Sequence, residues 1–434
     1  MKVLNRRFFM KKTAMVFLIW QLFLSPCLIF ASDDPKVDIH GFIGQGYLKS
    51  DHNNFLADTQ DGTFQYNEMG LDFITRMNDR LRVGMQFFAR DLGSLGNDEI
   101  KLDWAYADYC FSNKIGLRAG IMKITHGFYN ESRDSDMART SIFLPQGMYN
   151  EEWRDSFIAI KGLSAYGYLF NHMAYQFQAG KLDAPLDGGL AKMFNGLGIF
   201  TIDSINTEKR LCYNGSIQIQ EIIDGLKVGA SFIDWEFTID MTYKPTYNIN
   251  LPIPVGTKGL VNGKATIWST GVEYNYNAIN LASEYVILSW DIPASILSFK
   301  NIGDLIPGYS FLNFDMEGWY VSGSYRFSDW FELGLMYSEY YWDKNDKNGS
   351  AYAKGVAASK IFNLVPALPS YWRYQKDLTL STRFDINENW TAKLEIHRVN
   401  GVGICDIGDN PGNGEWYDLE KDWMLFAAKV IFSF

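Results

Sequence analysis

The chain has 434 residues, of which 16% are aromatic and 21% are charged, and its formal net charge at pH 7 is −10. An acidic balance of this kind repels polyanions, so nucleic-acid binding is excluded as a main function. Cys27, Cys110, Cys212 and Cys405 are the four cysteines. They are too few and too widely spread for a disulfide framework.

The first 31 residues have the layout of a secretory signal peptide. Residues 1–12 contain five basic residues and no acid, and an apolar run follows from Ala14 to Leu24. That run is too short for a permanent spanning helix. We expect cleavage after Ala31, which leaves residues 32–434 as a single domain. Without the five basic residues, 35 Lys and Arg stand against 50 Asp and Glu.

From residue 37 onward, apolar and polar residues alternate with period two in many segments, which predicts β-strands with two different faces. In residues 81–91, for example, Val83 and Met85 fall on one face, whereas Arg82 and Gln86 fall on the other. About sixteen strands are predicted, at residues 37–49, 64–76, 81–91, 99–111, 115–124, 156–170, 173–182, 210–221, 226–241, 264–276, 279–291, 314–327, 330–343, 377–386, 390–399 and 422–434.

The predicted strands are joined by connections of two very different lengths. Seven tight turns form hairpins, and one of them carries the Asp224-Gly225 step that is typical of such turns. The long connections are residues 50–63, 92–98, 125–155, 183–209, 242–263, 292–313, 344–376 and 400–421. An even strand number with short periplasmic turns at one rim and long extracellular loops at the other predicts an all-β, antiparallel, up-and-down transmembrane β-barrel.

Alternation alone does not separate this barrel from a soluble β-sandwich. In a sandwich the apolar face is the core, whereas in a barrel it meets lipid and the polar face lines a water-filled lumen. The predicted signal peptide and the asymmetry of the connections favour the barrel. Aromatic residues beside the tight turns also fit a girdle at the membrane interface, although aromatic residues are common in strands generally. These residues are Phe111, Phe170, Tyr276, Phe327, Trp330 and Trp390.

The last strand, DWMLFAAKVIFSF, ends on Phe434 and resembles the closing strand of bacterial outer-membrane barrels, whose assembly machinery reads such an end. With HGFIGQGYL near the start, RAGIMKITHGFYNESRD at residues 118–134 and VIFSF at the end, the whole mature chain resembles Gram-negative outer-membrane porins. The likeness to the phosphate-selective and other substrate-selective families is distant. The resemblance implies a homotrimer in contact with outer-membrane lipid, and a channel for passive diffusion of small hydrophilic solutes or ions. It does not identify the solute.

The resemblance further implies that the third long connection, residues 125–155, folds into the barrel and narrows it. The alternative is a solvated surface loop, because stretches rich in charged residues are usually exposed to solvent. Fixed charges of both signs across a narrow pore sort solutes by charge, although each residue taken singly has the simpler role of keeping the lumen wet. Other inward positions predicted by alternation are Glu68, Asp72, Lys101, Asp103, Glu395 and Lys429. The predicted constriction and selectivity residues are Arg82, Arg90, Arg118, Glu131, Arg133, Asp134, Asp136, Arg139, Arg154, Arg383 and Lys393.

An enzyme and a structural barrel are the two alternatives to the pore. The chain has five histidines and neither a G-x-S-x-G nor an H-E-x-x-H motif, so we expect no catalytic residues, no cofactor and no metal site. His397, two residues after Glu395, is interpreted as lumen lining. The long loops keep open a non-conducting barrel that acts as an adhesin or structural anchor.

Overall fold

The computed structural model describes residues 36–170, 172–196, 198, 200–207, 210–245, 254–291, 313–358, 369–410 and 419–434. The chain divides into two units, Met1–Lys36 and Val37–Phe434, and the fold below is that of the second. The predicted signal peptide and nearly all of the connection at residues 292–313 lie outside the described residues.

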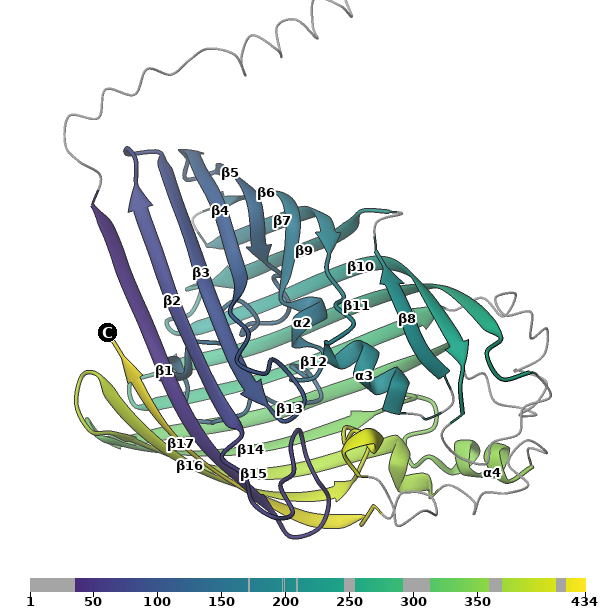
Figure 1. Ribbon diagram of the computed structural model, residues 1–434. Helices are drawn as coiled ribbons and strands as arrows, with labels where there is room; N and C mark the ends of the chain where they lie inside the picture. The colour runs from purple at the N-terminus through teal and green to yellow at the C-terminus, as the bar shows by residue number, and fades with distance from the viewer. Residues whose placement is uncertain are drawn as a thin grey trace, which may run out of the picture. The chain divides into compact units, whose positions relative to one another are not determined.

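Strands dominate the described part of the second unit and form one antiparallel sheet (Figure 1). Each strand pairs with its neighbours in the chain, apart from one exception given below. The strands are β1 (Val37–Ser50), β2 (Tyr66–Arg76), β3 (Leu81–Leu92), β4 (Lys101–Ser112), β5 (Ile115–Lys123), β6 (Ala159–Leu169), β7 (Met173–Leu182), β8 (Phe200–Asn206), β9 (Cys212–Gln220), β10 (Leu226–Tyr243), β11 (Lys258–Tyr276), β12 (Ile279–Asp291), β13 (Asn313–Ser328), β14 (Phe331–Tyr341), β15 (Tyr374–Asp385), β16 (Trp390–Gly401) and β17 (Asp422–Ser433).

The sheet closes into a barrel because β1 pairs with both β2 and β17. The register of the closing pair runs from Phe42↔Ser433 to Ser50↔Leu425. Phe434 extends the closure, since its N–H donates to the carbonyl of Gly41 at 3.0 Å and its carbonyl accepts from the N–H of Gly41 at 3.1 Å. Closure leaves no unpaired edge in the ring. The predicted antiparallel transmembrane barrel is confirmed.

The sixteen predicted strands are all present, and β8 is a seventeenth among the described residues. It was predicted as part of a long connection, because FTIDSIN is short and has no tight turn beside it. β7 pairs directly with β9, so the ring itself has sixteen strands. β10 is 18 residues long and outruns β9, and β8 pairs with the remaining half of β10 from Thr238↔Asn206 to Tyr243↔Phe200.

Some predicted boundaries were wrong for a related reason. β11 begins at Lys258 and not at residue 264, because it pairs with the long end of β10 as far as Thr242↔Lys258. β15 begins at Tyr374 opposite Tyr341 of β14. The turn after β9 contains Gly225 with φ +77°, where a Cβ atom would lie 1.8 Å from the carbonyl oxygen of Asn275. Only glycine fits there, as the Asp-Gly signal implied.

Exposure of the two strand faces separates the barrel from a soluble sandwich. On β15, Leu378 and Leu380 are each 44% exposed, whereas Thr379 and Ser381 between them are 0% and 4% exposed. The apolar face therefore lies outside and the polar face inside, the reverse of a soluble core. The six aromatic residues beside the tight turns are all at least 42% exposed, as an interfacial girdle requires.

Among the described residues, the helices are all too short or too polar to cross a membrane. They are η1 (Asp136–Ala138), α2 (Arg154–Phe157), α3 (Gly189–Gly196), α4 (Ser350–Ala358), η5 (Ser370–Arg373) and η6 (Ile407–Asp409).

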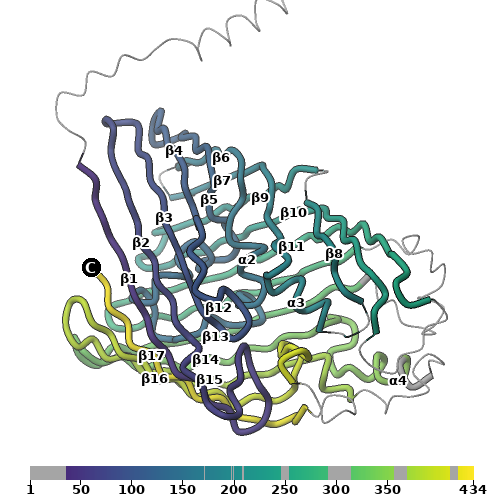
Figure 2. Tube along the Cα trace, viewed as in Figure 1, coloured from purple at the N-terminus to yellow at the C-terminus, as the bar shows by residue number. Residues whose placement is uncertain are grey.

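The inner wall is not polar throughout. Where β10 to β13 are longest, buried side chains such as Trp235, Phe237 and Leu288 form an apolar cluster inside the ring, together with Phe143 and Phe157 from the segment between β5 and β6. That segment, with α2, crosses in front of β10 to β12 in the tube view (Figure 2). The barrel therefore encloses a hydrophobic core, which holds the connection between β5 and β6 in place.

Candidate pore constriction

Residues 125–155, called the inner loop from here on, leave the end of β5 and return to the start of β6. Their hydrogen bonds reach β9, β14 and β16, none of which neighbours β5 in the ring. The backbone N–H of Thr125 donates to Asn214 of β9 at 3.0 Å, the hydroxyl of Thr140 donates to Glu332 of β14, and the N–H of Ile142 donates to Glu395 of β16 at 2.7 Å. The inner loop thus lies across the interior of the barrel.

Glu284 on β12 anchors the first part of the inner loop. Its carboxylate accepts hydrogen bonds from the N–H of Phe128 at 2.8 Å and from the hydroxyls of Tyr149 at 2.6 Å and Tyr320 at 2.7 Å. The glutamate is 2% exposed. A buried carboxylate with three donors is well satisfied, so breaking this anchor would leave a costly buried charge.

Residues on β15 and β16 anchor the middle of the inner loop. Glu395 accepts hydrogen bonds from the N–H groups of Ile142 at 2.7 Å and Phe143 at 3.1 Å. The ammonium of Lys393 donates to the carbonyls of Asp136 at 2.6 Å and Ser141 at 2.9 Å. Arg383 donates to the carbonyl of Met137 at 2.6 Å. Lys393 is 1% exposed, so its charge is used to hold backbone and does not face open lumen.

Ion pairs hold the two ends of the inner loop to β3, β4 and β5. Arg154 lies 2.9 Å from Asp103 and 2.8 Å from Asp134, and Lys123 pairs with the same two aspartates. Arg90 bridges Glu151 and Asp155 at 3.2 Å each. Burial alone would raise the pKa of Asp134, but Arg154 and Lys123 outweigh it and hold that pKa well below its usual range.

Asp136 is held in a similar way near η1. Its carboxylate pairs with Arg139 and with Lys429 of β17, and Lys429 pairs in turn with Glu68 of β2. Burial would raise the pKa of Asp136, but the cations around it, with Arg139 first, lower that pKa instead. The inner loop is therefore tied to both sides of the seam at which β1 and β17 close the ring.

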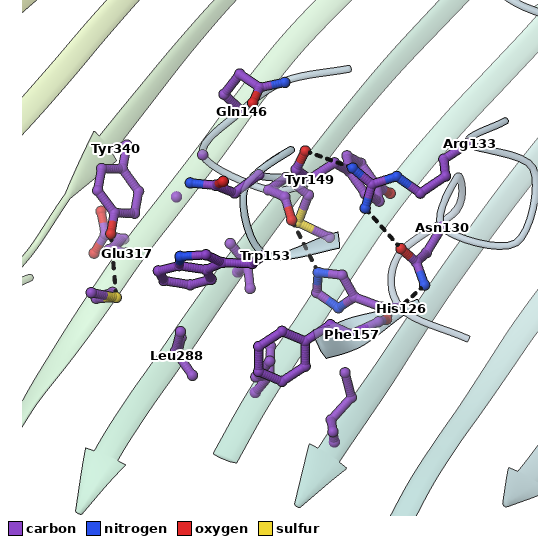
Figure 3. A pocket seen from close by; sticks show the side chains of 18 residues that line it. His126, Asn130, Arg133, Gln146, Tyr149, Trp153, Phe157, Leu288, Glu317 and Tyr340 are labelled. Carbon is purple, nitrogen blue, oxygen red and sulfur yellow. Dashed lines mark hydrogen bonds between the residues drawn. The ribbon is translucent and has the colours of Figure 1, made fainter. Parts of the chain in front are cut away.

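A small pocket lies between the inner loop and the inner faces of β10 to β14 (Figure 3). It measures about 60 Å³ and is bordered by His126, Tyr149, Trp153 and Leu288. His126 interacts through Nε2 with the carbonyl of Met148 at 3.2 Å, and burial lowers its pKa to about 4, so the ring is neutral at pH 7. A space of this size holds one or two water molecules. It belongs to the packing of the loop and not to a solute path.

One edge of the inner loop remains exposed. Glu131, Ser132 and Ser135 are exposed there, and the charge of Glu131 interacts with that of Arg118 on β5. Arg118 lies 3.2 Å from Asp108, which also pairs with Arg82 at 3.0 Å. The side chain of Arg82 is 42% exposed. An acidic loop edge and a basic patch on the wall therefore border the same space.

Two larger polar cavities border the inner loop. One of about 890 Å³ is lined by Arg90, Asp103, Arg154 and Asp155, and extends to β8. The other, of about 350 Å³, is lined by Arg139 and Thr140 of the loop and by wall residues that include Glu273, Arg326 and Arg383. Cavities lined by charged and polar side chains therefore adjoin the loop at its middle and at its end.

The structure divides the predicted site residues into groups. Arg82, Arg118 and Glu131 border the open space described above. Arg139 and Arg383 retain partly exposed side chains, at 17% and 11%. The other predicted residues are buried and hydrogen-bonded within the loop and wall, and these are Arg90, Arg133, Asp134, Asp136, Arg154 and Lys393.

Sequence reasoning missed Glu284, Asn214 and the tyrosines that bind Glu284. Glu284 sits in the run SEYVILSW, where a single acid among apolar residues on an inward position is a signal of a buried anchor. Its donor Tyr149 is 135 residues away in the chain, so the partner was not readable.

Among the described residues, one group of acids has the spacing of metal ligands, formed by Glu152, Asp406 and Asp409. The ammonium of Lys192 on α3 lies 2.7 Å from Asp409, 3.5 Å from Asp406 and 3.9 Å from Glu152. The lysine supplies the positive charge that a cation would bring. The cluster therefore ties the end of the inner loop to α3 and η6.

No protein-family model and no curated protein matches this chain. Solved structures are similar to it over nearly its whole length. The outer-membrane channel DcaP of Acinetobacter baumannii is 12% identical with a TM-score of 0.54, and the match covers 92% of this chain and 97% of that one. The anion-selective porin from Comamonas acidovorans is 11% identical with a TM-score of 0.53, over 92% and 100%. Salmonella typhi OmpF, solved with daunomycin, is 12% identical with a TM-score of 0.54, over 92% and 98%. This chain has the fold of the outer-membrane porins.

Proposed function

We propose that this protein is a porin of the Gram-negative outer membrane, which lets small hydrophilic solutes or ions diffuse passively past the inner loop. The observation that carries the proposal is the exposed edge of that loop, where Glu131 interacts with Arg118, and Arg118 shares Asp108 with the exposed Arg82. The polar cavities beside the loop support it. Neutral and charged solutes alike need a polar path through the lumen of a barrel.

The cellular setting follows from the same proposal. Residues 1–31 direct export and are removed, the outward apolar faces contact outer-membrane lipid, and the barrel assembly machinery recognises the end of β17 through Phe434. The protein works without catalysis and without a cofactor. A homotrimer is the expected assembly, carried over from the resemblance to porins.

Recording from planar lipid bilayers tests the pore directly. Purified protein that has been checked for folding should produce stepwise conductance, and a salt gradient should give a reversal potential that reflects the fixed charges at the constriction. Folded protein that inserts without conductance steps would overturn the pore.

A second candidate function is a non-conducting barrel that serves as an anchor. It is favoured by the hydrophobic core inside the ring, where Trp235, Leu288 and Phe143 are buried and fill part of the lumen. The bilayer experiment separates the two, because a plugged barrel inserts silently whereas a porin conducts.

A further inference from the structure

His397 on β16 is buried between two carboxylates. Its Nδ1 lies 2.8 Å from Oδ2 of Asp377 on β15, and its Nε2 lies 2.8 Å from Oε1 of Glu395. The hydroxyl of Thr379 is 3.1 Å from Nδ1. A neutral imidazole carries a proton on one nitrogen only, whereas an imidazolium donates from both. Both nitrogens face carboxylate oxygens, so the geometry matches the two donors of the doubly protonated ring.

Glu395 connects this histidine to the inner loop. Oε1 is within hydrogen-bond distance of the Phe143 N–H and of His397, and Oε2 accepts from the Ile142 N–H and from the Ser381 hydroxyl at 2.7 Å. These four donors fill the acceptor positions of one carboxylate. The glutamate is 0% exposed, so its charge depends on these donors and on the imidazolium beside it.

Other elements around the ring bring no competing charge. β17 places Leu425 opposite His397, and the inner loop places the ring of Phe143 at 6.1 Å. Lys393, two residues before Glu395 on the same face of β16, donates to loop carbonyls. Asp377 and Glu395 are therefore the charged groups in direct contact with the histidine.

We propose that His397, Asp377 and Glu395 form a charge-dependent latch, which holds the middle of the inner loop against the wall while the imidazole is protonated and releases it when that proton is lost. Deprotonation turns a lone pair of the ring toward one carboxylate and leaves two buried negative charges without a cation between them. Glu395 then moves away from the neutral ring, and this movement removes an acceptor from Ile142 or Phe143. Asn214, which accepts from the Thr125 N–H at 3.0 Å, carries no titratable group, so the first part of the loop stays attached.

Hydrogen exchange measured by mass spectrometry tests the latch without requiring conductance. Folded, detergent-solubilised protein is compared from pH 5 to pH 10, with an unstructured peptide of the same sequence as the correction for intrinsic exchange. Protection of the Ile142 and Phe143 amides should fall by about tenfold or more at the alkaline end. Protection of the Thr125 amide, which donates to the non-titrating Asn214, should stay constant. Equal protection of residues 142–143 across the whole range overturns the latch.

Variants give an independent test. In His397→Gln, which carries no charge, protection of residues 142–143 should be low and independent of pH, whereas His52→Gln, at an exposed histidine, should behave like the parent. Glu395→Gln serves as a second variant in case His397→Gln does not fold, and it should also lose the pH dependence. A parental pH profile in either variant at the latch overturns the proposal.

Discussion

The charges that remain exposed in the lumen are the ones expected to set ion preference. Arg82→Gln should shift the reversal potential toward cations, and Glu131→Gln should shift it toward anions, because each removes one fixed charge at the edge of the open space. The shifts should be larger at 0.1 M salt than at 1 M, where the Debye length falls from about 10 Å to about 3 Å. Arg398→Gln, an exposed arginine on the outward face of β16, is the control. Reversal potentials equal to those of the parent in both lumen variants at low salt would contradict this assignment.

The buried charges of the inner loop have a different role, so their neutralisation should cost stability before it changes selectivity. Arg154→Met leaves Asp103 and Asp134 without their shared guanidinium, and loss of one partner in a buried ion pair costs about 3–5 kcal/mol. Thermal unfolding in detergent should show a clearly lowered transition. An unchanged transition would mean that the network is dispensable.

The same pairs make the inner loop sensitive to acid. Because the pKa values of Asp134 and Asp136 are lowered in the fold, their contribution to stability is present above the ordinary aspartate pKa of about 3.9 and is lost as the pH falls through the lowered values. Thermal unfolding from pH 6 to pH 2 should show this loss. Asp134→Asn should remove part of the pH dependence in that window, and a slope as steep as that of the parent would count against the assignment.

At the scale of elements, Lys192 on α3 joins three long connections. The pKa of Glu152 is raised by burial and by the neighbouring Asp406, and the pKa of Asp406 is raised by its own burial. The lysine is therefore needed to balance the cluster. Lys192→Met should increase cleavage by added protease in the loops that hold α3 and η6, whereas Lys354→Met, at an exposed lysine of α4, should not. A chelator should leave the protease cleavage of the parent unchanged. Reduced cleavage on addition of calcium would show that a metal ion, and not Lys192, balances the charge of the cluster.

At the scale of the whole molecule, the closing strand should matter more for assembly than for stability. The Phe434 ring is 53% exposed, so its loss should cost less than the 1.5 to 3 kcal/mol of a fully buried side chain, as an order of magnitude. Its backbone bonds to Gly41 remain in Phe434→Ser. We expect this variant to refold in detergent but to reach the outer membrane in much lower yield. Phe327→Ser, which removes another exposed aromatic residue, is the control, and equal yields would refute the assembly role.

The outward apolar surface also dictates how the purified protein behaves. The barrel should remain folded only in detergent or lipid, because Leu378, Leu380 and their counterparts on other strands face outward. Unheated samples should migrate faster on gels than boiled ones, with β-rich circular dichroism before heating. A stable, monodisperse protein in detergent-free buffer would contradict the barrel.

The architecture could be predicted from the amino-acid sequence, because period-two alternation and connection length are local properties of the chain. Sixteen strands, seven tight turns and the pairing of the first strand with the last were readable without coordinates. β8 was not, because it exists only where the long end of β10 offers it a partner.

The role of each charged side chain became apparent only from its contacts in the folded barrel. Arg118 and Arg154 have the same side chain, yet the first borders open space, whereas the second is buried between Asp103 and Asp134. The anchors Glu284 and Glu395 meet donors 135 and more residues away. Contacts at that separation follow from closure of the ring and from the apolar core inside it, and neither the alternation of a strand nor the composition of a loop encodes them locally.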